Sequence, residues 1–147
     1  MSGSLDDLNE RSVLHASAVA VDDRAVLILG ASGSGKSSLA LALMGWGATL
    51  VADDRVILNW AGASVLLSPP GAIAGRIEAR GVGILTAEYQ SQVPLSLIVD
   101  LDEMETDRLP PQRSKILLGI SFPLLHNIGT AHFAPSILQY LRGGRAE

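Results

Sequence analysis

The residues best suited to chemistry lie in the stretch GASGSGKS (Gly30–Ser37), which fits the pattern G-x-x-x-x-G-K-[ST]. Glycines allow successive backbone N–H groups to turn inward around phosphate oxygens, where larger side chains would collide. Lys36, one of only two lysines in the chain, would bridge the outer phosphates, and the Ser37 hydroxyl can bind Mg²⁺. We therefore predict a loop that binds Mg²⁺–ATP or another nucleoside triphosphate through Gly30, Ala31, Ser32, Gly33, Ser34, Gly35, Lys36, Ser37 and Ser38.

Two adjacent acids follow the next apolar segment, in VADDR (Val51–Arg55). Ligands of open α/β sheets bind at the carboxyl ends of strands, where Asp53 and Asp54 would lie. Phosphoryl transfer uses an acid that holds the metal and often a base that accepts the acceptor's proton. Because neighbouring side chains of an extended chain point in opposite directions, one acid would face the metal or the acceptor and the other a structural partner. A plain acidic turn is the alternative.

A second candidate site lies in IEARGVGIL (Ile77–Leu85), where Glu78 and Arg80 stand two residues apart. On an extended chain they would share one side, and a carboxylate beside a guanidinium could serve metal and phosphate together. A solvent-facing, salt-bridged loop explains the same residues equally well. His15, in the first predicted strand, would be a phosphate contact or a proton relay if its role is not structural.

The elements that would position these residues follow a mixed α/β order, with more hairpins than a doubly wound sheet contains. An apolar strand before the glycine loop and a helical segment after it favour a phosphate loop over an ordinary glycine-rich turn with an exposed lysine. Val13–Val21 and Ala25–Gly30 should pair as a hairpin, and Ser68–Leu85 should be mostly loop with a helical turn. The other predicted strands are residues 48–54, 56–60, 64–68, 95–101 and 115–122, and the predicted helices are residues 36–46 and 135–144.

The composition limits the class of protein. A chain of 147 residues with 48% hydrophobic residues suits a single globular domain, residues 1–147. The net charge of −4 and the lack of a basic run exclude an electrostatic site for nucleic acid or for an anionic membrane. The absence of cysteine excludes disulfides and thiolate metal sites. No apolar run reaches the ~20 residues of a membrane helix and no signal peptide is visible, so we expect a cytoplasmic protein.

Four motifs in fixed order resemble the catalytic domain of HPr kinase/phosphorylase, a bacterial protein-serine kinase of the phosphotransferase system. The family carries a histidine upstream of the glycine loop, as His15 lies here, and the sequence VADD after the loop helix. Its signature E-I-R-G-x-G-I is similar to EARGVGI (Glu78–Ile84) at five of the six specified positions. The resemblance extends over residues 13–85, and its motifs are LHASAV, GASGSGKSS, VADDR and IEARGVGI.

The resemblance implies a P-loop fold related to phosphoenolpyruvate carboxykinase, with a mixed sheet, hairpins and few helices. It implies ATP and Mg²⁺ as cofactors, an HPr-like phosphocarrier as the protein substrate, and a homo-oligomer, usually a hexamer. Asp54 would be the first choice for the residue that accepts the serine proton and returns it in the reverse reaction. The implied metal ligands are Ser37, Asp53 and Glu78, and the implied catalytic residues are His15, Lys36, Asp53, Asp54 and Arg80.

Two features depart from the family pattern. The chain is similar to the short α-proteobacterial forms, so we expect one catalytic domain over residues 1–147 with no N-terminal domain. The family's later P-x-R-P-G-R-N loop, which supplies an arginine, has no counterpart in the corresponding region Phe122–Gly129. Either His126 or Arg113 would substitute, or the activity has changed. The alternatives are a nucleotide-binding regulatory module without turnover and another P-loop small-molecule kinase; no arginine-rich lid supports the latter.

Overall fold

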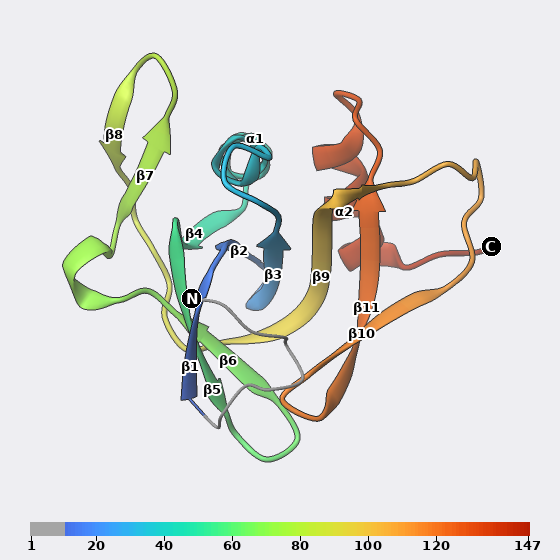
Figure 1. Ribbon diagram of the computed structural model, residues 1–147, viewed down its shortest axis with the longest axis horizontal. Coiled ribbons are helices and arrows are strands. Elements are labelled where there is room, and N and C mark those ends of the chain that lie inside the picture. Colours follow the sequence, from blue (N-terminus) through green and yellow to red (C-terminus); the bar gives the residue numbers. More distant parts are fainter. Residues whose placement is uncertain (1–10) are drawn as a thin grey trace.

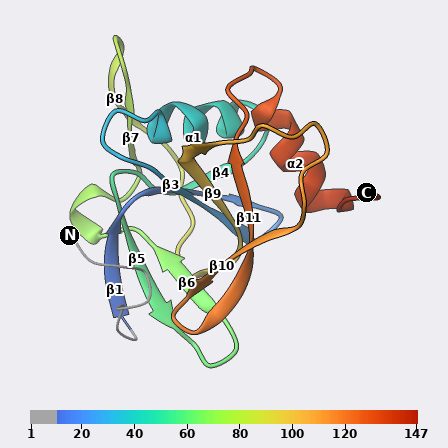
Figure 2. The same cartoon turned by 45° about the vertical axis from the view of Figure 1, so that its right-hand side comes forward.

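One sheet of nine strands bends around its central strand β9 (Val93–Met104), as Figures 1 and 2 show. The computed structural model describes residues 11–147. The first residues of β9 pair with β6, and the following residues pair in parallel with β3 on one side and β11 on the other. The other eight strands of this sheet are β1 (Arg11–His15), β2 (Ser17–Val21), β3 (Arg24–Leu29), β4 (Thr49–Ala52), β5 (Arg55–Trp60), β6 (Val65–Ser68), β10 (Arg113–Leu117) and β11 (Ile120–Asn127). A separate sheet has two strands, β7 (Arg76–Ala79) and β8 (Gly83–Thr86).

Both faces of the middle of this sheet are buried, which explains why β2 and β3 are apolar at nearly every position. Alternate residues of each strand enter different clusters. Ala18 and Leu27 face the strands β1, β5 and β6, whereas Val19 and Ile28 face the helices. The two clusters hold the phosphate-loop strand β3 from both sides, so its end is a fixed support for the loop.

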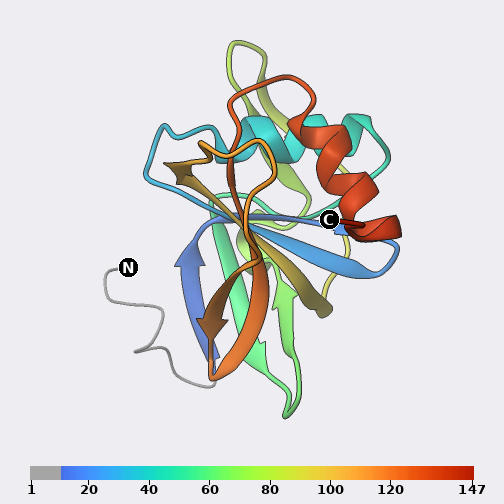
Figure 3. The same cartoon turned by 90° about the vertical axis from the view of Figure 1, so that its right-hand side faces the viewer.

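Two helices lie side by side over one face of the sheet (Figure 3): α1 (Lys36–Gly45) and α2 (Phe133–Gly143). Leu43 of α1 and Ile137 of α2 are fully buried in the same cluster. Burial of each such side chain contributes about 1.5–3 kcal/mol relative to exposure. No helix within residues 11–147 is both long and apolar enough to cross a membrane.

Most predicted elements are confirmed, but the first predicted strand is wrong. Val13–Val21 is two strands that separate at Ala16, whose N–H donates to the Asp54 carbonyl at 3.2 Å. β1 pairs with β5, while β2 pairs with β3 and β4. The chain therefore crosses from one half of the bent sheet to the other at Ala16, which a stretch rich in small and β-branched residues does not reveal.

Two further predictions are corrected by hairpins. Ser68–Leu85 contains the predicted helical turn, η2 (Gly71–Ile73), but it is not mostly loop. After this 3₁₀ turn, β7 and β8 form a two-stranded sheet that projects from the body (Figure 1). Residues 115–122 are not one strand, because the chain reverses at Leu118 and Gly119 between β10 and β11. The first hairpin has short strands beside glycines, a pattern that sequence reading assigns to loops. The second turns at Leu118, whose left-handed backbone with φ 51° is not indicated by the apolar residues around it.

Candidate functional site

The loop between β3 and α1 has the shape that its glycines predict. Gly35 caps the N-terminus of α1 with φ 102°, a left-handed conformation that other residues rarely adopt. A Cβ at Gly30 would collide with the Ser34 hydroxyl. The loop lies at the N-terminus of α1, so the positive end of the helix dipole faces it. No acidic residue in the first turn and no side-chain cap offsets this positive end. This is the arrangement that binds phosphate.

Lys36 folds back across the mouth of the loop. Its Nζ donates to the carbonyl oxygens of Gly30 at 2.8 Å and Ala31 at 3.0 Å. The ammonium therefore already lies where negative charge would enter, held by neutral acceptors that a phosphate can replace.

The buried carboxylate of Asp53 joins four segments of the chain. Its Oδ1 accepts hydrogen bonds from the hydroxyls of Ser17 and Ser37, each at 2.7 Å. Its Oδ2 accepts a 3.0 Å bond from the backbone N–H of Glu78. Asp53 is 7% exposed, so it fixes the ends of β2, α1 and β7 against β4.

The neighbouring Asp54 points the other way. Its side chain is 70% exposed and lies 4.0 Å from the Arg55 guanidinium. Its φ of 71° and the 2.8 Å bond from Arg55 N–H to the Asp53 carbonyl define a tight γ-turn, a strained conformation for a residue with a side chain. The two acids thus diverge, with Asp53 facing its hydrogen-bond partners and Asp54 facing solvent. That Asp54 meets the metal or the acceptor stays a prediction.

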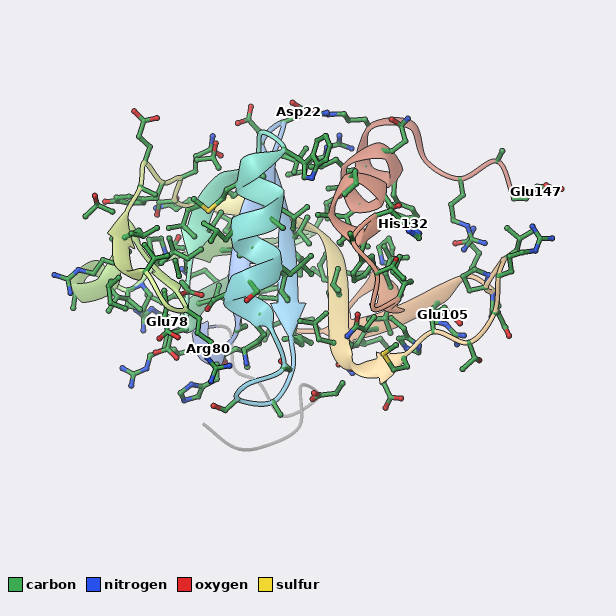
Figure 4. The ribbon with its side chains drawn as sticks, turned by 90° about the horizontal axis from the view of Figure 1, so that it is seen from above. Asp22, Glu78, Arg80, Glu105, His132 and Glu147 are labelled. Atoms are coloured by element: carbon green, nitrogen blue, oxygen red, sulfur yellow. The ribbon has the colours of Figure 1, made fainter. Side chains whose placement is uncertain are left out.

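Two adjoining hollows open beside the loop, one of about 320 Å³ and one of about 330 Å³, and they share Ser37, Asp54 and Glu78. Both lie on the side of α1 where Figure 4 shows Glu78 and Arg80. The first is lined by Ser17, Ser32, Gly33, Gly35, Lys36, Ser37, Ser38, Asp54, Glu78 and Arg80. The second is lined by Ser37, Asp53, Asp54, Ile73, Arg76, Ile77, Glu78 and Ile84.

The structure therefore gathers most of the predicted site residues, with differences. Arg80 lies beyond the end of β7, so it does not share a strand face with Glu78, yet both residues line the first hollow. His15 is exposed at the end of β1, opposite Arg55, and it lines neither hollow. Its register places it near the Asp54 turn without bringing it to the loop.

Sequence reasoning missed two residues that the structure places at the site. Ser17 donates to Asp53. Asp102, near the end of β9, accepts the Ala31 N–H with both carboxylate oxygens at 3.0 Å. A signal for Asp102 was available, because it follows an apolar strand just as Asp53 does.

The region of the expected arginine loop is a strand, since residues 122–127 belong to β11. Of the two suggested substitutes, His126 lies beside Asp100 of β9. Arg113 donates through Nε and Nη2 to the Glu105 carboxylate, each at 3.0 Å. That guanidinium lowers the pKa of Glu105 to about 2, and the Glu105 side chain is only 7% exposed. Arg113 is thus committed to a structural ion pair.

A family model described as the HPr Serine kinase C-terminal domain matches residues 6–119. The HPr kinase/phosphorylase of Prosthecochloris aestuarii is 30% identical over 133 residues, which cover 82% of this chain and 39% of that protein. The HPr kinase/phosphorylase of Caldanaerobacter subterraneus subsp. tengcongensis is 35% identical over 111 residues, covering 70% and 36%. The chain thus spans about two fifths of the length of these relatives.

A solved structure is also similar. The HPr(Ser) kinase/phosphatase from Coxiella burnetii superposes with a TM-score of 0.76 at 29% identity, covering 89% of this chain and 94% of the other. Together with the mixed sheet and the loop geometry, this likeness confirms the predicted fold class, a P-loop kinase domain with hairpins and few helices.

Proposed function

We propose that this chain, which belongs to the family of HPr serine kinase C-terminal domains, is an ATP-dependent protein-serine kinase acting on an HPr-like phosphocarrier. One observation carries this proposal. The carboxylate of Asp53 contacts Ser17, Ser37 and the N–H of Glu78, so a single group connects all four sequence motifs of the resemblance. The four motifs therefore lie together around one carboxylate, which supports a single site over chance matches scattered along the chain.

In this proposal the loop binds the phosphates of ATP, and Lys36 exchanges the carbonyls of Gly30 and Ala31 for phosphate oxygens. The carrier's serine oxygen forms the new bond to the γ-phosphorus as the bond to the β–γ bridging oxygen breaks, and the serine proton passes to Asp54. The exposure of Asp54 and its place in both hollows support this role over Asp53, which is buried and hydrogen-bonded. The Arg80 guanidinium would contact the negatively charged oxygens of the transferred phosphoryl group.

The residues also fit Mg²⁺. Within residues 11–147 no three His, Cys, Asp or Glu side chains form a metal site by themselves. Mg²⁺ typically takes one or two carboxylates, with phosphates and water completing its shell, and it prefers oxygen ligands. Ser37, Asp53 and Glu78 supply such oxygens around one hollow. Held there, the ion would supply positive charge that neutralises the phosphates.

We further propose a homo-oligomer, with a hexamer expected from the family resemblance, and a cytoplasmic location. The projecting hairpin supports an oligomer, because Val82 and Ile84 are 75% and 62% exposed there.

His15, at the end of β1, would be a supporting catalytic residue near the acceptor serine. We also propose that the chain acts as a single kinase domain.

A second reading, a nucleotide-binding regulatory module without turnover, is favoured by one observation. Arg113, a candidate to replace the absent loop arginine, is held by Glu105. In that case the chain would bind ATP, and a carrier would receive no phosphate. The absence of the family's loop arginine also predicts that the reverse, phosphorylase reaction is slower than the kinase reaction.

Incubation with labelled ATP and an HPr-like carrier tests these readings, with phosphoserine identified by mass spectrometry. We expect transfer by the wild type, and its loss in Lys36→Ala and in Asp54→Asn. Asp23→Asn is the matched control, because Asp23 is also exposed and left-handed, with φ 62°, but lies in the β2–β3 turn. ATP binding without transfer to any carrier supports the regulatory module. Equal transfer by Asp54→Asn and wild type excludes Asp54 as the base.

A further inference from the structure

Asp102 holds the first residues of the phosphate loop. β9 runs parallel to β3 with Asp100 beside Leu29, so Asp102 comes next to Ala31. Both of its oxygens accept the Ala31 N–H at 3.0 Å, and its own N–H donates to the Asp100 carboxylate at 2.9 Å. The carboxylate is thus aimed at one backbone group of the loop.

The same peptide unit contacts Lys36 from the opposite direction. No peptide bond in the described chain is cis, so the carbonyl of Gly30 points away from the N–H of Ala31. That carbonyl accepts the Lys36 ammonium at 2.8 Å. A carboxylate therefore lies at one end of the Gly30–Ala31 peptide and an ammonium at the other. Each hydrogen bond polarises the peptide in the sense that strengthens the other.

We propose that Asp102 is a positioning residue for Lys36, acting through the Gly30–Ala31 peptide; this rests on the proposed binding of nucleotide by the loop. The carboxylate prevents the peptide from turning over, because the turned peptide would present its carbonyl oxygen to Asp102. When Lys36 leaves the carbonyls of Gly30 and Ala31 for phosphate, Asp102 still accepts the Ala31 N–H and keeps the Gly30–Ala31 peptide in the same orientation. Asp102 does this without touching the nucleotide.

The test compares Asp102→Ala and Asp102→Asn with Glu103→Gln, a matched control that removes the charge of the next, exposed residue. Since the chain has only two lysines, ¹³C-lysine labelling gives two Cε signals, and Lys115 is an internal reference for Lys36. We expect the Lys36 signal to shift and amide exchange at Ala31 to become about tenfold faster in Asp102→Ala. The affinity for ADP, measured by calorimetry, should fall about fivefold to tenfold, with Asp102→Asn intermediate.

Two results overturn the proposal. One is an Asp102→Ala protein with unchanged ADP affinity and an unmoved Lys36 signal. The other is a general loss of stability, in which amides throughout β3 and β9 exchange faster and the Lys115 signal moves as much as that of Lys36. ADP binding and the lysine signals need no carrier, so these outcomes are separate from a failure of the proposed kinase activity.

Discussion

The two sides of the phosphate loop treat their charged residues in opposite ways. On the open side, Asp54, Glu78 and Arg80 are exposed and line the hollow beside Lys36. On the braced side, Asp102 binds the loop backbone and Glu105 binds Arg113. Figure 4 shows Glu78 and Arg80 on one side of α1 and Glu105 on the other.

This difference separates charges that support the loop from charges that remain available to a substrate. A charged group that already has a close protein partner must lose it before it can bind another. On the open side Asp54 has Arg55 at 4.0 Å, and such an exposed contact costs little to lose. We therefore expect substitutions on the open side to change activity with little change in stability, and loss of the Glu105–Arg113 ion pair on the braced side to do the reverse.

The strongest test of the comparison replaces one arginine on each side with alanine, Arg80 on the open side and Arg113 on the braced side. Arg80→Ala should lower phosphoryl transfer about 100-fold, because it removes a cation from the hollow where phosphate charge develops, and should leave Tm unchanged. Arg113→Ala should lower Tm by several degrees, since it leaves the nearly buried Glu105 carboxylate without its partner. Carrier phosphorylation and thermal unfolding of both variants measure this. An Arg113→Ala protein of full stability that transfers no phosphate would show that the braced side is catalytic.

The adjacent aspartates provide the next test. Asp53→Ala should lower the free energy of unfolding by about 3 kcal/mol, because the Glu78 N–H and two serine hydroxyls lose their shared acceptor. Asp54→Asn should change it by less than about 0.5 kcal/mol, since the residue is exposed and Asn tolerates its left-handed backbone. Urea unfolding of both variants gives the values, and similar losses would remove the distinction between the two acids.

Strong acid should weaken the Glu105–Arg113 ion pair of the braced side. The pKa of Glu105 is lowered to about 2 in the folded chain from an ordinary 4.5, so its ion pair contributes fully above pH 4.5. That contribution is lost as the pH falls through the folded value near 2. The stability difference between wild type and Glu105→Gln should therefore be constant above about pH 5 and shrink between pH 4.5 and 2. A difference that persists unchanged at pH 2 contradicts the ion pair.

The smallest effect is expected far from both sides. Arg142 lies 3.4 Å from Asp22, and both side chains are about half exposed. Such a surface pair contributes little, so Arg142→Ala should lower the free energy of unfolding by less than about 0.5 kcal/mol and leave transfer unchanged. This variant gives the baseline for the other substitutions. A larger loss would mean that α2 depends on this contact.

Local patterns were enough to predict several parts of the site. The glycines and Lys36 define the loop because the backbone conformations they allow are decided within a few residues. Asp53 and Asp54 were found because acids that follow a buried strand lie where ligands bind. The helix after the loop and the β5–β6 hairpin followed from periodicity and turn residues, and both are confirmed.

By itself, the sequence predicted the glycine loop and the acids Asp53, Asp54 and Glu78, because loop conformation and strand alternation are properties of neighbouring residues. Only the tertiary structure decided which of these residues contact one another, and it added Ser17 and Asp102. Asp53 meets Ser17 from 36 residues away and the Glu78 N–H from 25, and Asp102 meets Ala31 from 71. Such contacts depend on the order and register of strands in the sheet, which no local pattern encodes. The burial of one aspartate and the exposure of the next follow from those contacts.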